Sequence, residues 1–156
     1  MTNFKKITCG LTMLMVMAIG VKSEPVSAAY SGSLEVNFTS INNSKGQICL
    51  NLFNGQTGFP DGGKGSGLKA AKCMPIVKGV AKFTFTNLPY GNYAISAVHD
   101  TNGDTRLNSN FLGVPNEGIG FSNNPVVVTA APSFSEAQFF LSKPKTDISI
   151  KMQYFN

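Results

Sequence analysis

The run of this chain whose residue types and spacing best suit chemistry is His99-Asp-Thr-Asn-Gly-Asp-Thr-Arg-Leu-Asn108. Asp100, Asn102 and Asp104 stand there at alternate positions, so a tight turn can bring their side-chain oxygens together. Oxygen ligands at this spacing suit a hard cation, as at positions 1, 3 and 5 of an EF-hand loop. Asn108 stands where position 9 would be. These four residues are therefore the predicted ligands of a calcium ion, which is the one cofactor that the sequence suggests.

The rest of the EF-hand signature is missing. Thr105 stands where that loop needs Gly, and Phe111 stands where it needs a bidentate Glu, although Glu117 could substitute from further along the chain. The competing interpretation is an Asx-rich turn, in which Asp and Asn side chains bond their own backbone. The sequence leaves both interpretations open.

The same run offers little for acid–base or nucleophilic catalysis. His99 is the single histidine, and on an extended strand it points to the opposite face from Asp100. The chain has no Gly-x-Ser-x-Gly elbow of the kind that activates a serine. We therefore predict no catalytic residue, and we expect His99 to lie at the edge of the core, bonded to a loop carbonyl.

The segment Gly113–Pro125 is predicted to be a self-packed loop that is either structural or a ligand surface. Gly118 and Gly120 permit positive φ in it. Apolar side chains can tuck under the end of the domain while the polar ones bond exposed backbone groups, and the loop 54–72 could complete a binding face. The apolar set is Phe111, Ile119 and Phe121, and the candidate binding residues of this region are His99, Glu117, Phe121, Ser122, Asn123 and Asn124.

The elements that must position these residues are strands, because apolar residues alternate with polar ones almost everywhere. Seven such runs are separated by turns rich in Gly, Asn and Pro, and they predict a single all-β domain: a seven-stranded sandwich of immunoglobulin-like or transthyretin-like type. The expected strands are 34–38, 48–52, 80–85, 93–97, 126–128, 137–141 and 148–154. Residues 54–72 and 99–124 are expected to be long loops, with one possible helical turn at 68–72.

Residues 1–29 read as a cleavable signal peptide. Lys5 and Lys6 precede an apolar run over residues 7–21, and residues 27–29 offer the small side chains that a signal peptidase requires. The run is shorter than the ~20 residues that a permanent membrane span needs. We therefore expect a secreted or periplasmic domain of residues 30–156, without a permanent membrane span.

Charge and cysteines limit the partners and the compartment. The formal net charge falls from +5 to +3 when Lys5, Lys6, Lys22 and Glu24 leave with the leader, and the remaining lysines are scattered. Nucleic acid is therefore not an expected partner, and we expect a monomer. Cys49 and Cys73 remain after cleavage, and an even cysteine count in an exported chain predicts a disulfide between them.

Two motifs carry a resemblance to known families. Phe83-Thr-Phe-Thr-Asn-Leu-Pro-Tyr-Gly-Asn-Tyr93 resembles the Leu-Pro-x-Gly-x-Tyr strand–turn–strand of transthyretin-like and carboxypeptidase-regulatory-like sandwiches. His99-Asp-x-Asn, followed by the run Leu107-Asn-x-Asn-Phe-Leu-Gly-Val-Pro-Asn-Glu-Gly-Ile-Gly-Phe-Ser-Asn-Asn-Pro125, is similar to an uncharacterised family of exported bacterial proteins, the domain of unknown function family 2141. The resemblance spans about residues 34–154 and implies a sandwich outside the cytoplasm, with no assigned activity. Members of that family often have Gly where this chain has Thr105.

Together these features predict a non-enzymatic binding or structural module whose partner is an unknown extracytoplasmic protein or ligand, with calcium as a candidate stabilising ion. The alternative is a small secreted hydrolase or carbohydrate-active protein that uses the 99–124 loop.

Overall fold

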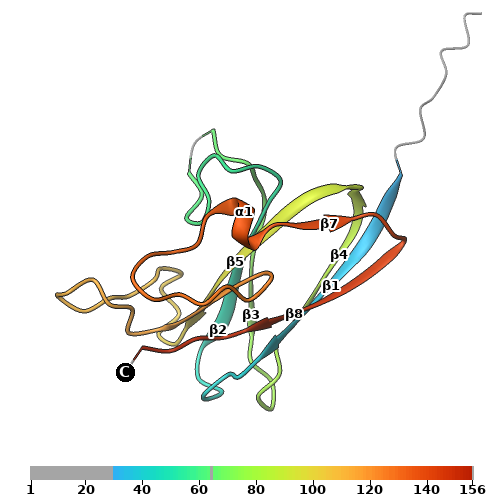
Figure 1. Cartoon of the computed structure of the whole chain (residues 1–156). Coiled ribbons are helices and arrows are strands. Elements are labelled where there is room, and N and C mark those ends of the chain that lie inside the picture. The colour runs from blue at the N-terminus through green and yellow to red at the C-terminus, as the bar shows by residue number, and fades with distance from the viewer. Residues whose placement is uncertain (1–29, 64, 156) are drawn as a thin grey trace, which may run out of the picture.

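The computed structural model of the chain describes residues 30–63 and 65–155 (Figure 1). The predicted signal peptide, residues 1–29, lies outside the described residues. In the described part the chain forms eight strands and one short helix. They are β1 Ser31–Thr39, β2 Gln47–Phe53, β3 Leu68–Pro75, β4 Lys82–Pro89, β5 Gly91–Asp100, β6 Gly118–Phe121, α1 Phe134–Ala137, β7 Phe139–Leu141 and β8 Lys145–Lys151.

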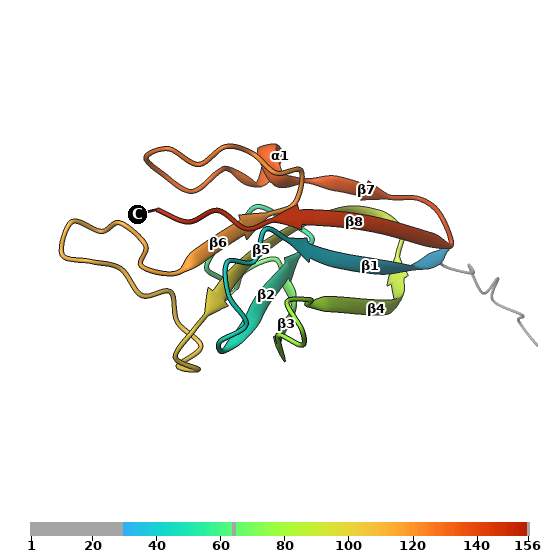
Figure 2. The ribbon, with the colours of Figure 1, turned by 90° about the horizontal axis from the view of Figure 1, so that it is seen from below.

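The strands form two sheets that enclose one main core (Figures 1 and 2). The smaller sheet has the order β4-β1-β8, in which β1 is antiparallel to β4 and parallel to β8. The larger sheet has the antiparallel order β3-β2-β5-β6, and the first residues of β5 also pair with β7. The prediction of a single all-β sandwich is therefore confirmed.

Three details of the strand prediction are wrong. Residues 126–128 form no strand, because the Val127 N–H bonds the Gln153 side chain instead of a neighbouring strand. β3 was expected to lie in a loop with a helical turn, and it escaped prediction because its side chains are nearly all exposed and so do not alternate. β6 was also expected to be loop, since glycine occupies every second position in it.

Alternating side chains of both sheets fill the core, as the period of two requires. In β1 and β2 every second residue is buried. The buried residues of this cluster are Leu34, Val36, Phe38, Ile48, Leu50, Leu52, Ile76, Ala81, Phe83, Phe85, Tyr93, Ile95, Ala97, Leu141, Ile150 and Met152.

A second apolar cluster lies on the opposite face of the larger sheet. Its buried members are Ala94, Ile119, Phe121 and Ala137, and partly buried side chains pack against them: Phe59, Val127, Phe134 and Phe155. This cluster fixes the loops 54–67 and 122–133 to the sheet. The described residues thus hold both sheets and both clusters.

The Leu-Pro-x-Gly-x-Tyr motif makes the crossing from the smaller sheet to the larger one. β4 ends at Pro89 and β5 begins at Gly91. The Tyr93 hydroxyl donates a hydrogen bond to the Pro89 carbonyl at 2.8 Å. This hydroxyl-to-backbone bond across a corner resembles the tyrosine corner of other sandwiches, and it fixes the angle at which β5 leaves β4.

The helix α1 is a single turn between the second cluster and β7. Ser133 and Glu136 form a capping box at its start. Among residues 30–63 and 65–155, no helix is long and apolar enough to cross a membrane.

Gly118 and Gly120 are needed for close packing of β6, and not for the positive φ that the sequence analysis predicted. Neither glycine has a positive φ. Both face the main core, where a Cβ on Gly118 would overlap the Tyr154 ring and a Cβ on Gly120 would lie 2.8 Å from the Ile150 Cγ2. The glycines therefore allow β6 to pack closely against the C-terminal segment.

Candidate functional site

Asp100, the last residue of β5, organises the turn that follows. Its Oδ1 accepts hydrogen bonds from the backbone N–H of Gly103 (2.7 Å) and of Asp104 (3.2 Å). Its Oδ2 accepts from the Thr105 N–H (3.0 Å) and from the Gln47 side chain (2.8 Å). Burial alone would raise the pKa of Asp100, but these four hydrogen bonds outweigh it and hold the pKa below the usual 3.8.

Asn102 and Asp104 continue the same pattern. The Asn102 Oδ1 accepts from the Asp104 N–H at 3.1 Å, and the Asp104 Oδ1 accepts from the Arg106 N–H at 2.9 Å. The Asp104 Oδ2 accepts from the amide groups of Asn102 (3.0 Å) and Asn108 (2.9 Å). The four predicted ligands therefore do come together, in the Asx-turn arrangement that was the competing interpretation.

A calcium ion at this turn would have to displace several of these N–H donors. In the described residues, no group of three or more His, Cys, Asp or Glu side chains is placed to hold a metal ion. Calcium binding here stays a prediction, and a thermal melt in EDTA and then in millimolar calcium tests it.

Glu117 joins the two ends of the turn. It is buried, and its Oε1 accepts from the Thr101 N–H (2.9 Å) and hydroxyl (3.2 Å). Its Oε2 accepts from the Asn108 N–H at 3.0 Å. Both carboxylate oxygens thus bond the turn itself, which gives Glu117 a structural role.

His99 is fully buried and uses both ring nitrogens. Its Nε2 lies 2.8 Å from the Lys45 carbonyl and its Nδ1 lies 2.8 Å from the Tyr154 hydroxyl. Because a carbonyl can only accept, we assign the hydrogen to Nε2, so Nδ1 accepts from the tyrosine. Burial raises the pKa of Tyr154 above 10.0, although a hydrogen bond from the Asn42 N–H partly offsets this effect, so the phenol keeps its hydrogen at neutral pH. His99 therefore bonds a loop carbonyl as expected.

The three polar residues after β6 bond backbone groups, as the sequence predicts. The Ser122 hydroxyl accepts from the Ile95 N–H at 2.8 Å. The Asn123 side chain donates to the Gln138 carbonyl, and the Asn124 side chain bonds β8 through the Ser149 carbonyl and the Lys151 N–H. These residues tie the end of β6 to β5, to Gln138 just before β7, and to β8.

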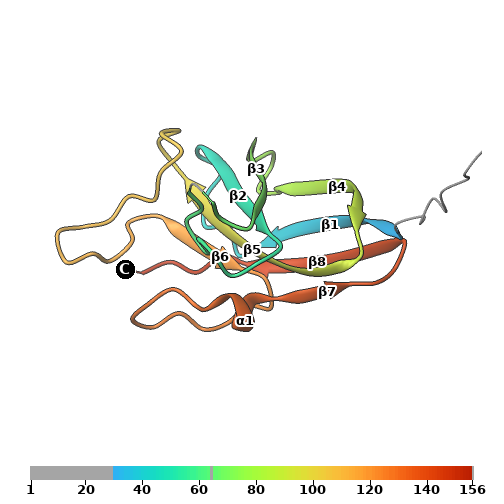
Figure 3. The ribbon, with the colours of Figure 1, turned by 90° about the horizontal axis from the view of Figure 1, so that it is seen from above.

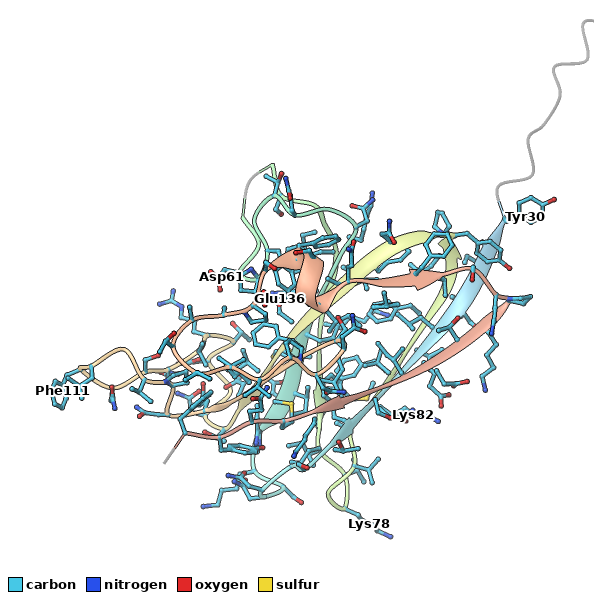
Figure 4. The ribbon with its side chains drawn as sticks, viewed as in Figure 1. Tyr30, Asp61, Lys78, Lys82, Phe111 and Glu136 are labelled. Atoms are coloured by element: carbon cyan, nitrogen blue, oxygen red, sulfur yellow. A yellow bond between two sulfur atoms is a disulfide. The ribbon has the colours of Figure 1, made fainter. Side chains whose placement is uncertain are left out.

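The apolar residues of this region divide into two groups. Ile119 and Phe121 are buried in the second cluster, as expected. Phe111 is not tucked under the domain: it is 95% exposed, at the tip of a projecting loop (Figure 4). The segment 108–116 closes on itself as a small hairpin, so its tip does not reach the core.

A groove of about 1110 Å³ lies on the outer face of the larger sheet. The sequence suggested that two loops could form a binding face, but not that the sheet lies between them. Its floor includes Ala71 of β3, Val98 of β5 and Ile119 of β6. The loops 101–117 and 122–133 and residues 60–61 form its walls, and their arrangement around the sheet is visible in Figure 3. Both loops that the sequence marked as long therefore border one groove.

Anchoring contacts hold the wall at residues 60–61 in place. The Ser96 hydroxyl of β5 donates to the Pro60 carbonyl at 2.6 Å. Phe59 packs edge-on against Phe53 and Phe134, with ring centroids 5.2 and 5.9 Å apart. The groove is thus built on the second cluster.

The predicted disulfide is confirmed and lies in the floor of the groove. Cys49 and Cys73 stand opposite each other on β2 and β3, and both border the groove. The bond fixes the edge strand β3 to the sheet.

One sequence signal could have pointed to the groove. Between Leu107 and Ser135 the single charged residue is Glu117, and large apolar residues recur through predicted loops. Apolar loops without charge are unusual on a surface and often mark a binding site.

Comparison with known proteins gives a family without an assigned function. The family model described as "Uncharacterized protein conserved in bacteria (DUF2141)" matches residues 36–149. No curated protein and no solved structure matches the chain. The family that the motifs resemble is confirmed.

Proposed function

We propose a binding function for this chain, which belongs to the uncharacterised bacterial family DUF2141. In this proposal the groove on the outer face of the larger sheet holds an uncharged, mainly apolar small molecule. The observation that carries it is the groove itself, whose volume of about 1110 Å³ slightly exceeds the usual range for small-molecule sites, about 300–1,000 Å³.

The lining of the groove supports an apolar ligand. Leu107, Leu112, Val114 and Val128 border the groove and are each more than a third exposed. Covering them with a ligand would remove apolar surface from water, which stabilises a complex by about 25 cal/mol per Å² before the costs of association.

The charges of the groove favour an uncharged ligand. Four charged residues border it, two of each sign. The Lys72 ammonium lies 4.6 Å from the centre of the Phe85 ring, and Asp100 is buried and fully hydrogen-bonded. Asp61, Lys72 and Arg106 are exposed. The two positive and two negative charges that border the groove sum to zero, so neither an anion nor a cation meets a complementary net charge.

The state of the titratable groups supports binding over catalysis. A general acid or base must reach the substrate with a free proton or lone pair. His99, Asp100 and Glu117 all lie buried in hydrogen bonds within the chain. The alternative of a hydrolase or carbohydrate-active protein would require one of these networks to open.

Export is part of the proposal. A disulfide persists in oxidising compartments, which fits a secreted or periplasmic domain. The signal-peptide pattern of residues 1–29 points to the same compartments.

The test is a fluorescence titration of residues 30–156 with the neutral apolar probe N-phenyl-1-naphthylamine. We expect saturable binding, and we expect Ala71→Arg to weaken it by about tenfold or more, because the change places bulk and charge in the floor of the groove. Thr84→Arg is the matched control, since Thr84 is also an exposed strand residue but lies in β4 of the smaller sheet. A probe that fails to saturate, or that binds both variants equally, would overturn the proposal.

A further inference from the structure

Exposed apolar side chains gather at one end of the molecule. In the described residues eleven large hydrophobic side chains are exposed, and six of them lie between residues 107 and 128. They are Leu107, Phe111, Leu112, Val114, Val126 and Val128. They belong to the loops 101–117 and 122–133, which project at the end where the chain terminates in all three ribbon views (Figures 1, 2 and 3).

The part of this end that residues 107–133 form presents almost no charge, whereas the exposed Asp104 and Arg106 precede it in the chain. From Leu107 to Ser135 the single charged residue is Glu117. Its side chain is 4% exposed and its carboxylate bonds Thr101 and Asn108. Hydrocarbon cannot solvate a charge, so a surface of this kind can enter an apolar medium without the large cost of burying an ion.

The projecting tip bonds most of its own backbone N–H groups. The Asn110 side-chain oxygen accepts from the N–H of Leu112 (2.9 Å) and of Val114 (3.0 Å). The Asn110 carbonyl accepts from the Gly113 N–H at 2.9 Å, and the Asn110 N–H donates to the Val114 carbonyl at 2.9 Å. In lipid, backbone polar groups must find partners within the protein, and the N–H groups of Asn110, Leu112, Gly113 and Val114 already have them.

We propose that this end of the sandwich docks on the surface of a lipid bilayer, with Phe111, Leu112 and Val126 entering its apolar part. The proposal goes beyond the binding groove and does not rest on it, because Phe111 and Val126 do not line the groove. A lipid surface fits better than a protein partner that pairs with backbone, since four N–H groups of the tip at residues 110–114 already bond within the chain.

The chemistry of the surface sets the expected kind of binding. Without a cluster of basic residues, docking depends on burial of apolar side chains, as for other proteins that lie in a membrane interface. Phosphatidylcholine, which has no net charge, should therefore suffice, and added salt should change the binding little.

The test is co-sedimentation of residues 30–156 with vesicles of phosphatidylcholine. This part of the chain holds both sheets and both clusters, and it omits the apolar run of residues 7–21, which would complicate the measurement. We expect binding that the double change Phe111→Ser with Val126→Ser weakens by about tenfold or more, because a buried Phe side chain alone contributes at least that factor. The same double variant should keep its affinity for N-phenyl-1-naphthylamine, so the two proposals can fail separately.

The matched control is Val77→Ser with Val80→Ser. These valines are 64% and 59% exposed, and they flank the hairpin that carries Lys78, which Figure 4 shows far from Phe111. This variant should bind the vesicles like the unchanged protein.

Three results would overturn the docking proposal. The first is no sedimentation with phosphatidylcholine. The second is binding only to vesicles with added phosphatidylglycerol that salt abolishes, which would show an electrostatic attachment. The third is a protein that does not bind vesicles but self-associates, with the self-association lost in Phe111→Ser. That result would make a second copy of the chain the partner.

Discussion

At the scale of single residues, carboxylates and amides in the 100–117 region serve mainly as acceptors for backbone N–H groups. The alternation of Asp100, Asn102 and Asp104 predicted side chains gathered in one turn, and in that turn their oxygens accept from backbone N–H groups while the Asn102 amide nitrogen faces Asp104. The sequence could not predict which donors would meet those oxygens, because that depends on how the turn places each N–H. The prediction that Phe111 packs under the domain is wrong for a related reason. The hairpin of residues 108–116 bonds within itself and carries the Phe111 side chain away from the sheet.

Asp100→Asn should destabilise the fold at neutral pH by about 1–3 kcal/mol, since the amide places its own N–H groups against backbone donors. The folded-state pKa of Asp100 lies below its usual 3.8, so its stabilisation is present above that value and is lost as the pH falls through the folded-state pKa. Urea unfolding at neutral pH and at a pH well below 3.8 checks this. The difference between variant and unchanged protein should shrink in acid.

The control is Asp147→Asn, which alters a half-exposed carboxylate 3.7 Å from Lys145. Such a surface ion pair contributes little, so this change should leave the stability nearly unchanged. An Asp100→Asn variant as stable as this control would contradict the role assigned to Asp100.

Tyr154→Phe should destabilise the fold by about 1–3 kcal/mol, because the buried Nδ1 of His99 loses its donor and the Asn42 N–H loses its acceptor. Chemical denaturation measures this directly. Tyr30→Phe, at a tyrosine that is 79% exposed, should have no effect. Equal stabilities of the two variants would mean that the His99 network does not stabilise the fold.

At the scale of elements, the strands with clear alternation were predictable and the others were not. β1 and β2 bury one face and so carry the period of two in their sequences. β5 is buried on both faces, and Tyr93, Ile95 and Ala97 alternate on its main-core side. β3 is an exposed edge strand, and β6 carries glycines where its core-facing side chains would be. Their sequences therefore lacked the hydrophobic pattern on which strand prediction depends.

Gly120→Ala should cost about 1–3 kcal/mol, because its Cβ would press β6 away from Ile150 and Met152. Gly55→Ala is the control, since nothing lies within 4 Å of a Cβ placed there. Thermal melts of both variants separate steric overlap from the general effect of replacing glycine. A tolerated Gly120→Ala would mean that β6 can move outward freely.

The disulfide belongs to the same scale, because it joins β2 to the edge strand β3. Changing both cysteines to serine should lower the free energy of unfolding by about 3 kcal/mol, as expected for closure of a loop of this length. The measurement is chemical denaturation of the oxidised protein and of the variant. We also expect weaker probe binding, since β3 supplies part of the groove floor.

At the scale of the whole molecule, the sequence suggested a binding face between two long loops but could not locate it on the fold. The walls of the groove come from residues 60–61, 105–115 and 127–131, which are far apart in the chain. Only the topology brings them to one face of the larger sheet, and strand order cannot be deduced from alternation alone. The family and the sandwich were predictable because motifs and periodicity are local properties of the sequence.

The central claim, that the groove is the ligand site, is tested most directly by amide chemical-shift mapping. Nitrogen-15-labelled residues 30–156 are titrated with N-phenyl-1-naphthylamine. The account predicts saturable shifts that are largest at amides lining the groove, such as those of Ala71, Val98 and Val128, with little change in the hairpin of Lys78. Shifts concentrated instead at the smaller hollow of about 520 Å³ beside residues 88–93, or an absence of saturable shifts, would contradict it.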